Sequence, residues 1–384
     1  MHVVYLQPHF TYPGGSGNFV LETAEQLVQR GVDVSIITQA GASDLPQRYP
    51  GIHFRFVGGS LPNTISYWVN YFRIYRKVEK IIDDIHPDII FPQVFPANYW
   101  GFLYKKHNPE IPCIWYIHDL NAFVHDRRVI DGLPNPMRLL ARSSNPLMKI
   151  IDTNLVSCAD CALANSKYTA ERYREIYGVS ETQVIYPGVA ISEFPTYPAE
   201  KEDYILCVSR LMKFKRIDLV LDALSLLKQS GINKRLVIAG DGEEKENLTQ
   251  QCRKLGLTDT VTFAGKFGRD RRDLLISYYT RAQCVVFSSV DEPFGIVPIE
   301  AQAAWTPVIA TRSGGPMESV VDGETGFLVE PNSVSALAEK ILYFDQNKQV
   351  AESMGITGRK NVETMFSWEK ATEQLLEVFT RYVH

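Results

Sequence analysis

The feature that most constrains this chain is a regular alternation between short β-branched or aromatic runs and longer segments with helical periodicity. The runs are predominantly apolar and do not alternate with polar residues, so both faces of each strand should be covered. Strands of this kind, alternating with helices, are typical of parallel sheets with helices on both sides. The runs of the first half are VVYL, DVSIIT, DIIFPQ, CIWYIH, CALANS and VIYPG, and those of the second half are YILCVS, RLVIAGDG, VTFAG, CVVFSS, PVIAT and GFLV.

A chain of 384 residues exceeds the usual size of one hydrophobic core, so two domains are expected. The segment PGVAISEFPTYPAEKED carries three prolines, several charges and no periodicity, which favours a linker. We therefore predict an α/β fold of two doubly wound domains facing a central cleft, with an N-terminal domain over 1–190, a linker over 191–203 and a second domain from 204. Ligands of such sheets bind at the carboxyl ends of the strands, so functional motifs should follow strands.

Composition and charge exclude several classes of function. A net charge of −4 gives no reason to expect nucleic acid, which requires a dominant basic face. The N-terminus has no basic leader and no apolar run approaches the ~20 residues that span a bilayer, so we expect a cytoplasmic protein. The six cysteines are scattered, as unpaired thiols of a reducing compartment are. Cys158 and Cys161 have the spacing of half a zinc site, but no second pair follows, so we prefer two packed thiols and expect no metal.

The first strand-to-helix loop is rich in glycine. Gly14, Gly15 and Gly17 lie where the helix that contains Glu22 begins. Glycines at this point let backbone N–H groups approach an anion, and a helix N-terminus adds partial positive charge. The spacing differs from the G-x-G-x-x-G of dinucleotide sites, so a tight turn without a ligand is an equal alternative.

A histidine and an acid, His118 and Asp119, follow the strand CIWYIH. A histidine at the carboxyl end of a strand is well placed to hydrogen-bond a substrate hydroxyl, with a strand-capping histidine as the alternative. The stretch 121–146 that follows is long and lacks periodicity, and we expect an irregular acceptor-binding lid there. Its arginines are Arg127, Arg128, Arg138 and Arg142.

Two cations follow the first strand of the second half. Arg210 and Lys215 lie five positions apart in a strand-to-helix loop. The arginine offers a fork of donors and the lysine a point charge, which together suit a diphosphate, whereas a solvated basic turn is the alternative. The next strand ends in Gly240, Asp241 and Gly242, which we interpret as a structural turn.

Two carboxylates, Glu292 and Glu300, lie in SSVDEPFGIVPIEAQAAW, between a strand and a buried helix. Pro298 is tolerated in the first turn of a helix, so the helix should begin near Gly295–Val297. An unpaired acid inside an apolar helix would be costly, so we assign Glu300 to a ribose and Glu292 to a transferred hexose. An anion would bind between them, at the N–H groups of Phe294, Gly295, Ile296 and Val297.

These motifs together resemble the retaining family-four glycosyltransferases, which have the GT-B fold of two Rossmann-like domains. The resemblance rests on Glu292-x7-Glu300, on FSSVDEPFG before the helix and on TRSGGPMESVVDGETGFLV after it. It covers nearly the whole chain and is weakest over 40–150, the region that carries acceptor specificity in this family. The last helix, 371–384, resembles one that crosses back to the N-terminal domain, so the donor domain would span 204–370. Further matching blocks are PGGSGNFVLETAEQLVQRGVDVSIIT, YPGV, SRLMKFKRIDLVLDAL, AGDGEEKENL and VTFAGKF.

The resemblance implies donor-binding roles for residues of the second half. Arg210 and Lys215 would hold the donor diphosphate, together with the amides around Gly295–Val297. Glu300 would bind the nucleotide ribose. The family usually has glycine after the motif lysine, whereas this chain has Arg216, so the path of that loop stays open.

The resemblance also implies three contacts with the reacting sugar. Glu292 would contact the transferred sugar on the face where chemistry occurs. His118 would touch the sugar near the anomeric centre, so these two residues are the expected catalytic pair. Gly15 would admit the pyrophosphate or the sugar from the N-terminal domain.

The expected chemistry follows from the leaving group, a nucleoside diphosphate that gains negative charge in the transition state. Metal-using transferases bind a cation through Asp-x-Asp, a motif that this sequence lacks. Arg210, Lys215 and the helix N-terminus would therefore stabilise that charge without a metal or cofactor. Retention without an evident nucleophile fits front-face attack, with double displacement through Glu292 as the alternative.

The resemblance implies a hexose from a UDP-linked donor, with GDP as the alternative, and a hydroxyl of a growing polysaccharide or lipid-linked oligosaccharide as acceptor. A GT-B sugar-nucleotide epimerase and a phosphorylase stay open as other enzymes, although a phosphorylase normally needs lysine-bound pyridoxal phosphate in a longer chain. A catalytically inactive glycan-binding scaffold is a third possibility. The joint presence of Arg210, Lys215, Glu292 and Glu300 disfavours it.

One segment, 66–85, has aromatic and aliphatic residues at helical spacing, interleaved with four basic residues. A helix of this kind could contact a membrane from the inner face, which would suit a lipid-linked acceptor. The preferred interpretation is an amphipathic helix packed on the N-terminal sheet. Its apolar positions are Trp68, Tyr71, Phe72, Tyr75, Val78 and Ile82.

Overall fold

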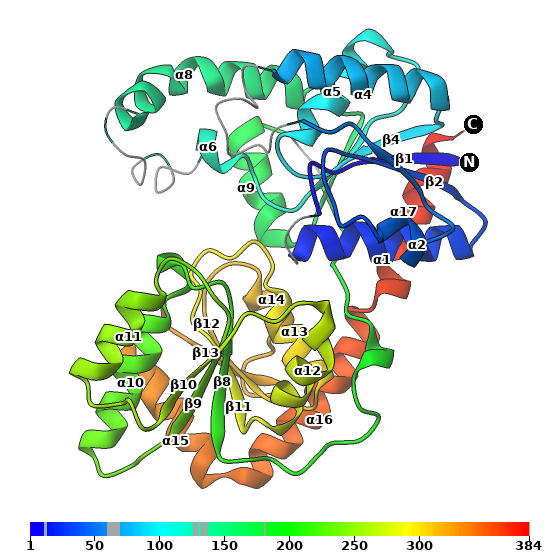
Figure 1. Cartoon of the computed structure of the whole chain (residues 1–384). Coiled ribbons are helices and arrows are strands. Elements are labelled where there is room, and N and C mark those ends of the chain that lie inside the picture. Colours follow the sequence, from blue (N-terminus) through cyan, green and yellow to red (C-terminus); the bar gives the residue numbers. More distant parts are fainter. Residues whose placement is uncertain are drawn as a thin grey trace. The chain divides into compact units, whose positions relative to one another are not determined.

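The computed structural model of the chain divides into two compact units (Figure 1). The first unit contains residues 1–186 and 371–384, and the second contains residues 187–370. The residues that the structure describes are 1–10, 14–59, 70–125, 130, 135, 137–179 and 182–383.

The first unit contains two parallel sheets that run side by side. The four-stranded sheet has the order β3-β2-β1-β4, the three-stranded sheet has the order β5-β6-β7, and a parallel bridge from Ile90 to Cys113 joins them. The chain therefore changes direction across the sheet between β1 and β4, which is a topological switch point. The strands are β1 (His2–Leu6), β2 (Asp33–Thr38), β3 (His53–Phe56), β4 (Ile89–Pro92), β5 (Ile114–Ile117), β6 (Cys161–Ala164) and β7 (Gln183–Val184).

Helices pack on these strands through their apolar sides. In α4, the residues Ile74, Val78 and Ile82 are buried in the same core as Val4 and Trp100, which gives this helix a stable position. The helices of the first unit are α1 (Gly15–Gln29), α2 (Leu45–Arg48), α4 (Tyr71–Ile85), α5 (Ala97–His107), α6 (Ala122–His125), α8 (Met137–Val156), α9 (Lys167–Tyr177) and most of α17 (Trp368–Tyr382).

The second unit is built on one six-stranded parallel sheet of order β10-β9-β8-β11-β12-β13. In chain order this is 3-2-1-4-5-6, the doubly wound arrangement, whose switch point lies between β8 and β11. The strands are β8 (Tyr204–Val208), β9 (Arg235–Ala239), β10 (Val261–Gly265), β11 (Cys284–Phe287), β12 (Val308–Thr311) and β13 (Gly326–Val329).

Helices cover both faces of this sheet, with α10 and α11 on one side and α12 and α13 on the other (Figure 1). The prediction of an α/β chain with two parallel-stranded domains is confirmed. The helices of the second unit are η1 (Ile191–Glu193), η2 (Lys213–Lys215), α10 (Ile217–Gln229), α11 (Lys245–Lys254), η3 (Arg269–Arg271), α12 (Arg272–Arg281), α13 (Ile296–Ala303), α14 (Pro316–Ser319), α15 (Val334–Gln346) and α16 (Lys348–Met365).

The division between the units falls at residue 187, a few residues before the predicted linker 191–203, which belongs to the second unit and contains η1. Most of the last helix belongs to the first unit, where the Phe379 ring lies 5.0 Å from that of Phe91. All six cysteines are free thiols, four of them buried. None of the helices in the described part of the chain is long and apolar enough to cross a membrane.

Candidate functional site

The switch point of the six-stranded sheet, in the second unit, brings together residues that are far apart in the sequence. Lys215 is the last residue of η2, in the loop that follows β8, and Glu292 lies in the loop that follows β11. Because β8 and β11 are hydrogen-bonded neighbours, both loops leave the same point of the carboxyl edge. Lys215 and Glu292, 77 positions apart, are therefore in contact.

The contact between these two residues is a close ion pair. The Lys215 Nζ donates to Glu292 Oε2 at 2.5 Å, and the Ser289 hydroxyl donates to the same oxygen at 2.8 Å. The lysine is buried, and its ammonium lies 5.0 Å from the Phe214 ring centre and 5.7 Å from that of Phe287. The sequence patterns assign these charges separately, Lys215 to a phosphate and Glu292 to a sugar. Without a ligand, they neutralise each other.

Arg210 lies at the start of the same loop and is exposed. No hydrogen bond ties its side chain to any residue in the described part of the chain, so it is free to reach an anion. Arg216, at the position where the family resemblance implies glycine, has φ 53°, the left-handed conformation that glycine adopts most readily. The loop therefore keeps a glycine-like conformation there, and Arg216 instead pairs with Asp218 at 3.0 Å.

The turn at Gly240–Gly242 supports the loop that carries Arg210 and Lys215. A Cβ on Gly240 would overlap the carbonyl oxygen of Ser209, and one on Gly242 would overlap that of Leu211. The Leu211 N–H donates to Asp241 O at 2.9 Å, which fixes this close approach. The structural interpretation of this turn agrees with these contacts.

A second pair of glycines supports the loop that carries Glu292. A Cβ on Gly314 would overlap the backbone of Glu292, and one on Gly315 would overlap that of Phe294. The Gly315 N–H donates to Glu292 O at 2.8 Å. In the sequence, SGG at 313–315 was recognised only as part of the family resemblance. Its position directly after a strand was the signal that the backbone passes close to another loop there.

The helix α13 begins at Ile296, as the position of Pro298 predicts. Gly295 precedes it with φ 85°, and a Cβ there would press against the Phe287 ring at 3.3 Å, so glycine is required. The first N–H groups of a helix have no partners within the helix and carry partial positive charge. Those of Ile296 and Val297 therefore lie a few residues after Glu292, where an anion could use them.

Glu300 is not the unpaired acid that its place in an apolar helix suggests. This residue is buried, but both carboxylate oxygens have partners: Arg272 Nη1 donates to Oε1 at 2.6 Å and Tyr279 Oη donates to Oε2 at 2.7 Å. Arg272 also donates to Glu193 at 2.9 Å. The expectation that an acid there lacks a structural explanation is therefore wrong. A ribose could still use the remaining lone pairs.

In the first unit, Gly15 lies beside the corresponding switch point. It is the first residue of α1, which follows β1, and it is exposed. Its N–H group is thus one of those that a helix leaves without an internal partner. Part of the loop between β1 and α1, residues 11–13, lies outside the described residues.

His118 follows β5, as predicted, and is half-buried. Its Nε2 lies 3.0 Å from Gln93 Oε1, and its ring packs edge to face against Phe19 and Tyr116. Burial lowers the pKa of His118 to about 3, so the imidazole is neutral at physiological pH. It can therefore exchange hydrogen bonds with a neutral hydroxyl but carries no charge.

The arginine-rich stretch 121–146 is more regular than predicted. Arg138 and Arg142 lie on α8, a helix that continues to Val156 with Pro146 inside it. The expectation of an irregular lid is wrong for this part, because serine, asparagine and proline weakened the helical pattern without ending the helix. Arg127 and Arg128 lie outside the described residues.

A buried polar cluster that the sequence analysis missed lies in the same region. Asp152 accepts hydrogen bonds from Tyr99, from Tyr177 at 2.5 Å and from His125 at 2.7 Å. Burial by itself would raise the pKa of Asp152, but these hydrogen bonds and the nearby His125 hold it below its ordinary value. The cluster joins α5, α6, α8 and α9, and so fixes the segment that follows His118.

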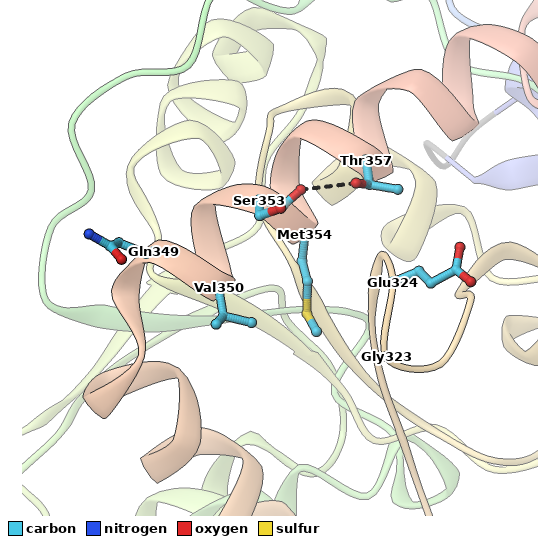
Figure 2. Close-up of a pocket in the computed structure, with 7 residues that line it drawn as sticks. All are labelled: Gly323, Glu324, Gln349, Val350, Ser353, Met354 and Thr357. Carbon is cyan, nitrogen blue, oxygen red and sulfur yellow. Dashed lines mark hydrogen bonds between the residues drawn. The ribbon is translucent and has the colours of Figure 1, made fainter.

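An open cavity of about 400 Å³ lies on the second unit, between α16 and the turn before β13 (Figure 2). Its lining combines polar and apolar side chains and contains none of the predicted site residues. Because it adjoins the start of β13 and not the carboxyl end of a strand, it is not where a doubly wound sheet binds its ligand. The lining residues are Gly323, Glu324, Gln349, Val350, Ser353, Met354 and Thr357.

Solved structures share this fold. An Anabaena protein, Alr3699/HepE, solved in complex with UDP-glucose, aligns over 99% of this chain and 100% of its own with a TM-score of 0.79 and 21% identity. A sucrose-phosphate synthase from Thermosynechococcus elongatus aligns over 99% of this chain and 98% of its own with a TM-score of 0.78 and 21% identity. Both confirm the GT-B architecture that the parallel sheets of the two units indicate.

Two family models match consecutive parts of the chain: Glycosyltransferase Family 4 over residues 13–193 and Glycosyl transferases group 1 over residues 191–361. The human alpha-1,3/1,6-mannosyltransferase ALG2 is 32% identical over 99% of this chain and 95% of its own. A D-inositol 3-phosphate glycosyltransferase from Kribbella flavida is 27% identical over 97% of this chain and 92% of its own. This chain therefore belongs to the family-4 glycosyltransferases, enzymes of the GT-B fold that use nucleotide sugars.

Proposed function

We propose that the enzyme transfers a hexose from a UDP-linked donor to a hydroxyl of a glycan or a lipid-linked oligosaccharide, with retention of configuration and without a metal. The observation that carries this proposal is the Lys215–Glu292 pair at the switch point of the six-stranded sheet. Glu292 lies a few residues before the start of α13. A cation, an acid and the N–H groups of a helix N-terminus, brought together by two neighbouring loops, suit a sugar diphosphate.

On donor binding, the Lys215 ammonium would turn from Glu292 to the diphosphate, joined by Arg210 and the amides of Ile296 and Val297. The backbone of Lys215 is held in place because the Ser288 hydroxyl donates to its carbonyl oxygen at 2.8 Å. Glu292, freed from the lysine, would accept hydrogen bonds from the sugar hydroxyls. Ligand binding would thus exchange one charge-assisted contact for another, and no charge would be left buried alone.

In the transfer step, the bond between the anomeric carbon and the diphosphate oxygen breaks while the acceptor oxygen bonds to the same face of that carbon. The acceptor proton passes to the departing diphosphate oxygen, so the products are a glycoside and a nucleoside diphosphate. Lys215, Arg210 and the α13 N-terminus would stabilise the negative charge that grows on the leaving group. Double displacement through Glu292 is the alternative, and it would leave a glycosyl ester on that residue.

Glu300 is proposed to bind the ribose through lone pairs that Arg272 and Tyr279 leave unused. The Anabaena neighbour was solved with UDP-glucose, which supports UDP as the donor nucleotide. The human relative is named a mannosyltransferase, and mannose donors with GDP are the alternative.

The proposal is tested by thermal-shift measurements with UDP-, GDP- and ADP-sugars, with and without EDTA. A ligand at one hundred times its Kd adds about 2.7 kcal/mol of apparent stability, which this assay resolves. Stabilisation by one nucleotide, unchanged by EDTA and lost in Lys215→Ala, is expected. No stabilisation by any nucleotide sugar would favour an inactive scaffold, and interconversion of the sugar nucleotide without an acceptor would favour an epimerase.

We also propose a peripheral membrane contact for a lipid-linked acceptor, through α8 and not through the segment 66–85. The described part of that segment contains α4, whose Tyr71, Tyr75, Val78 and Ile82 are buried, as the preferred interpretation expects. Phe72, which the same interpretation placed on the apolar face, is exposed, and Trp68 lies outside the described residues. On α8, by contrast, Leu139, Leu147 and Ile150 are 71%, 60% and 59% exposed, with Arg142 and Lys149 on the same helix.

An exposed apolar row with basic neighbours suits a membrane that contains anionic lipids. Flotation with anionic vesicles is expected to recover the wild type but not the variant Leu147→Glu/Ile150→Glu. Phe72→Glu, on α4, is the matched control because that side chain is also exposed. Failure of the wild type to float, or equal flotation of the α8 variant, would refute this contact.

A further inference from the structure

Gln93 is held rigidly at the switch point of the first unit, between β1 and β4. It follows β4 directly and is 1% exposed. Its N–H donates to Leu6 O at 3.1 Å, and its carbonyl accepts from Trp115 Nε1 at 2.8 Å. Contacts with β1 and β5 therefore fix its backbone.

The hydrogen bonds of the Gln93 amide determine which of its ends faces His118. The amide Nε2 donates to Phe91 O at 3.0 Å. The opposite orientation would place Oε1 against that carbonyl oxygen, where two acceptors would repel each other. Oε1 therefore faces His118 Nε2, at 3.0 Å.

An amide oxygen can only accept, so His118 Nε2 must carry the proton of this hydrogen bond. Because burial keeps the ring neutral, Nδ1 then has a free lone pair. Among the residues that the structure describes, Nδ1 has no hydrogen-bond partner. Phe19 and Tyr116, whose ring centres lie 5.1 and 4.7 Å from that of the imidazole, hold the ring edge to face.

We propose that Gln93 is a positioning residue that fixes His118 as its Nε2–H tautomer, so that Nδ1 accepts a hydrogen bond from a sugar hydroxyl. This inference rests on the proposed function for the identity of the hydroxyl, which belongs to the transferred sugar or to the acceptor. With the other tautomer, Nδ1–H would be a donor and would select a different group. Gln93 thereby fixes the kind of contact that His118 makes without touching the substrate itself.

The tautomer is measured directly by long-range ¹H–¹⁵N NMR of the intact enzyme labelled at its eight histidines, with His118 assigned from the spectrum of His118→Asn. The expected spectrum has a protonated Nε2 and an unprotonated Nδ1. A protonated Nδ1 in the wild type would overturn the proposal, and this outcome needs no variant to fold. In the isosteric variant Gln93→Met, the two tautomers are expected to mix. An unchanged Nε2–H tautomer in that variant would also overturn the proposal.

Kinetics separate an effect through His118 from a general loss of structure. Gln93→Met should lower kcat about tenfold, in the range of one lost hydrogen bond. In a His118→Ala background, the same change should cost less than twofold, because its target is gone. Equal losses in both backgrounds would overturn the proposal. Full activity of His118→Ala would instead refute the role of His118 in the proposed function, while the tautomer measurement would still decide the role of Gln93.

Discussion

The ion pair between Lys215 and Glu292 predicts a specific pattern of stability changes in the enzyme without ligand. Lys215→Met keeps most of the aliphatic stem against Phe214 and Phe287 but removes the charge. Glu292 then keeps the Ser289 hydrogen bond at 2.8 Å and loses its cation. Because its side chain is only 20% exposed, water cannot fully replace the lysine.

The expected magnitude lies between two limits. Exposed ion pairs contribute about 0.2–1 kcal/mol, and breaking a fully buried pair costs about 3–5 kcal/mol. The side chains here are 10% and 20% exposed, so we expect Lys215→Met to lower the free energy of unfolding by about 2 kcal/mol. Glu292→Gln should cost about 1.5 kcal/mol for the same reason. The double variant leaves neither charge alone and should cost only about 1 kcal/mol.

These free energies are measured by urea unfolding followed by circular dichroism, with equal m values as the condition for comparison. The matched control is Lys213→Met, an exposed lysine two residues away, which should change stability by less than about 0.5 kcal/mol. A coupling energy of about 2.5 kcal/mol between Lys215 and Glu292 is expected from the cycle. Additive losses in the double variant would refute the ion pair in solution.

Three further changes test the surroundings of the site. Gly315→Ala should destabilise the second unit by about 3 kcal/mol in urea, since the added Cβ overlaps the backbone of Phe294, and an unchanged midpoint would contradict that close approach. Asp152 has a lowered pKa in the folded state, so its contribution is complete above about pH 5 and is lost as the pH falls through that lowered value. Wild-type stability should therefore fall more steeply below pH 4 than that of Asp152→Asn, and parallel curves would contradict this. In calorimetry, Glu300→Gln should weaken the binding of UDP about tenfold but the binding of inorganic pyrophosphate less than twofold. Equal losses of the two affinities would contradict a ribose contact.

The sequence predicted most strands because parallel strands are buried on both faces and therefore read as apolar runs. It missed β3, whose four residues are half-buried or exposed at the edge of its sheet and form no such run. It also missed the helical part of 137–156, where local propensity is poor and contacts of Asp152 with α5, α6 and α9 hold the helix. Tertiary contacts outweighed local preference there.

For the candidate site, the sequence placed residues at strand ends but not their partners. The partners of Glu300 lie 28 and 21 positions before it, on α12, where nothing in the local pattern connects them with an acid on α13. The contact of Lys215 with Glu292 depends on the order of β8 and β11 in the sheet, which an alternating pattern does not specify. Left-handed Arg216 could not be anticipated either, because arginine rarely adopts that conformation.

The most direct test of the central claim is isothermal titration of UDP into the wild type and into Lys215→Met, both in EDTA. If the switch point of the second unit holds the diphosphate through this lysine, the wild type binds and the variant binds at least tenfold more weakly, since a hydrogen bond to a charged group contributes about 1.5–3 kcal/mol. Equal affinities of the two proteins would contradict the claim, as would wild-type binding that EDTA abolishes.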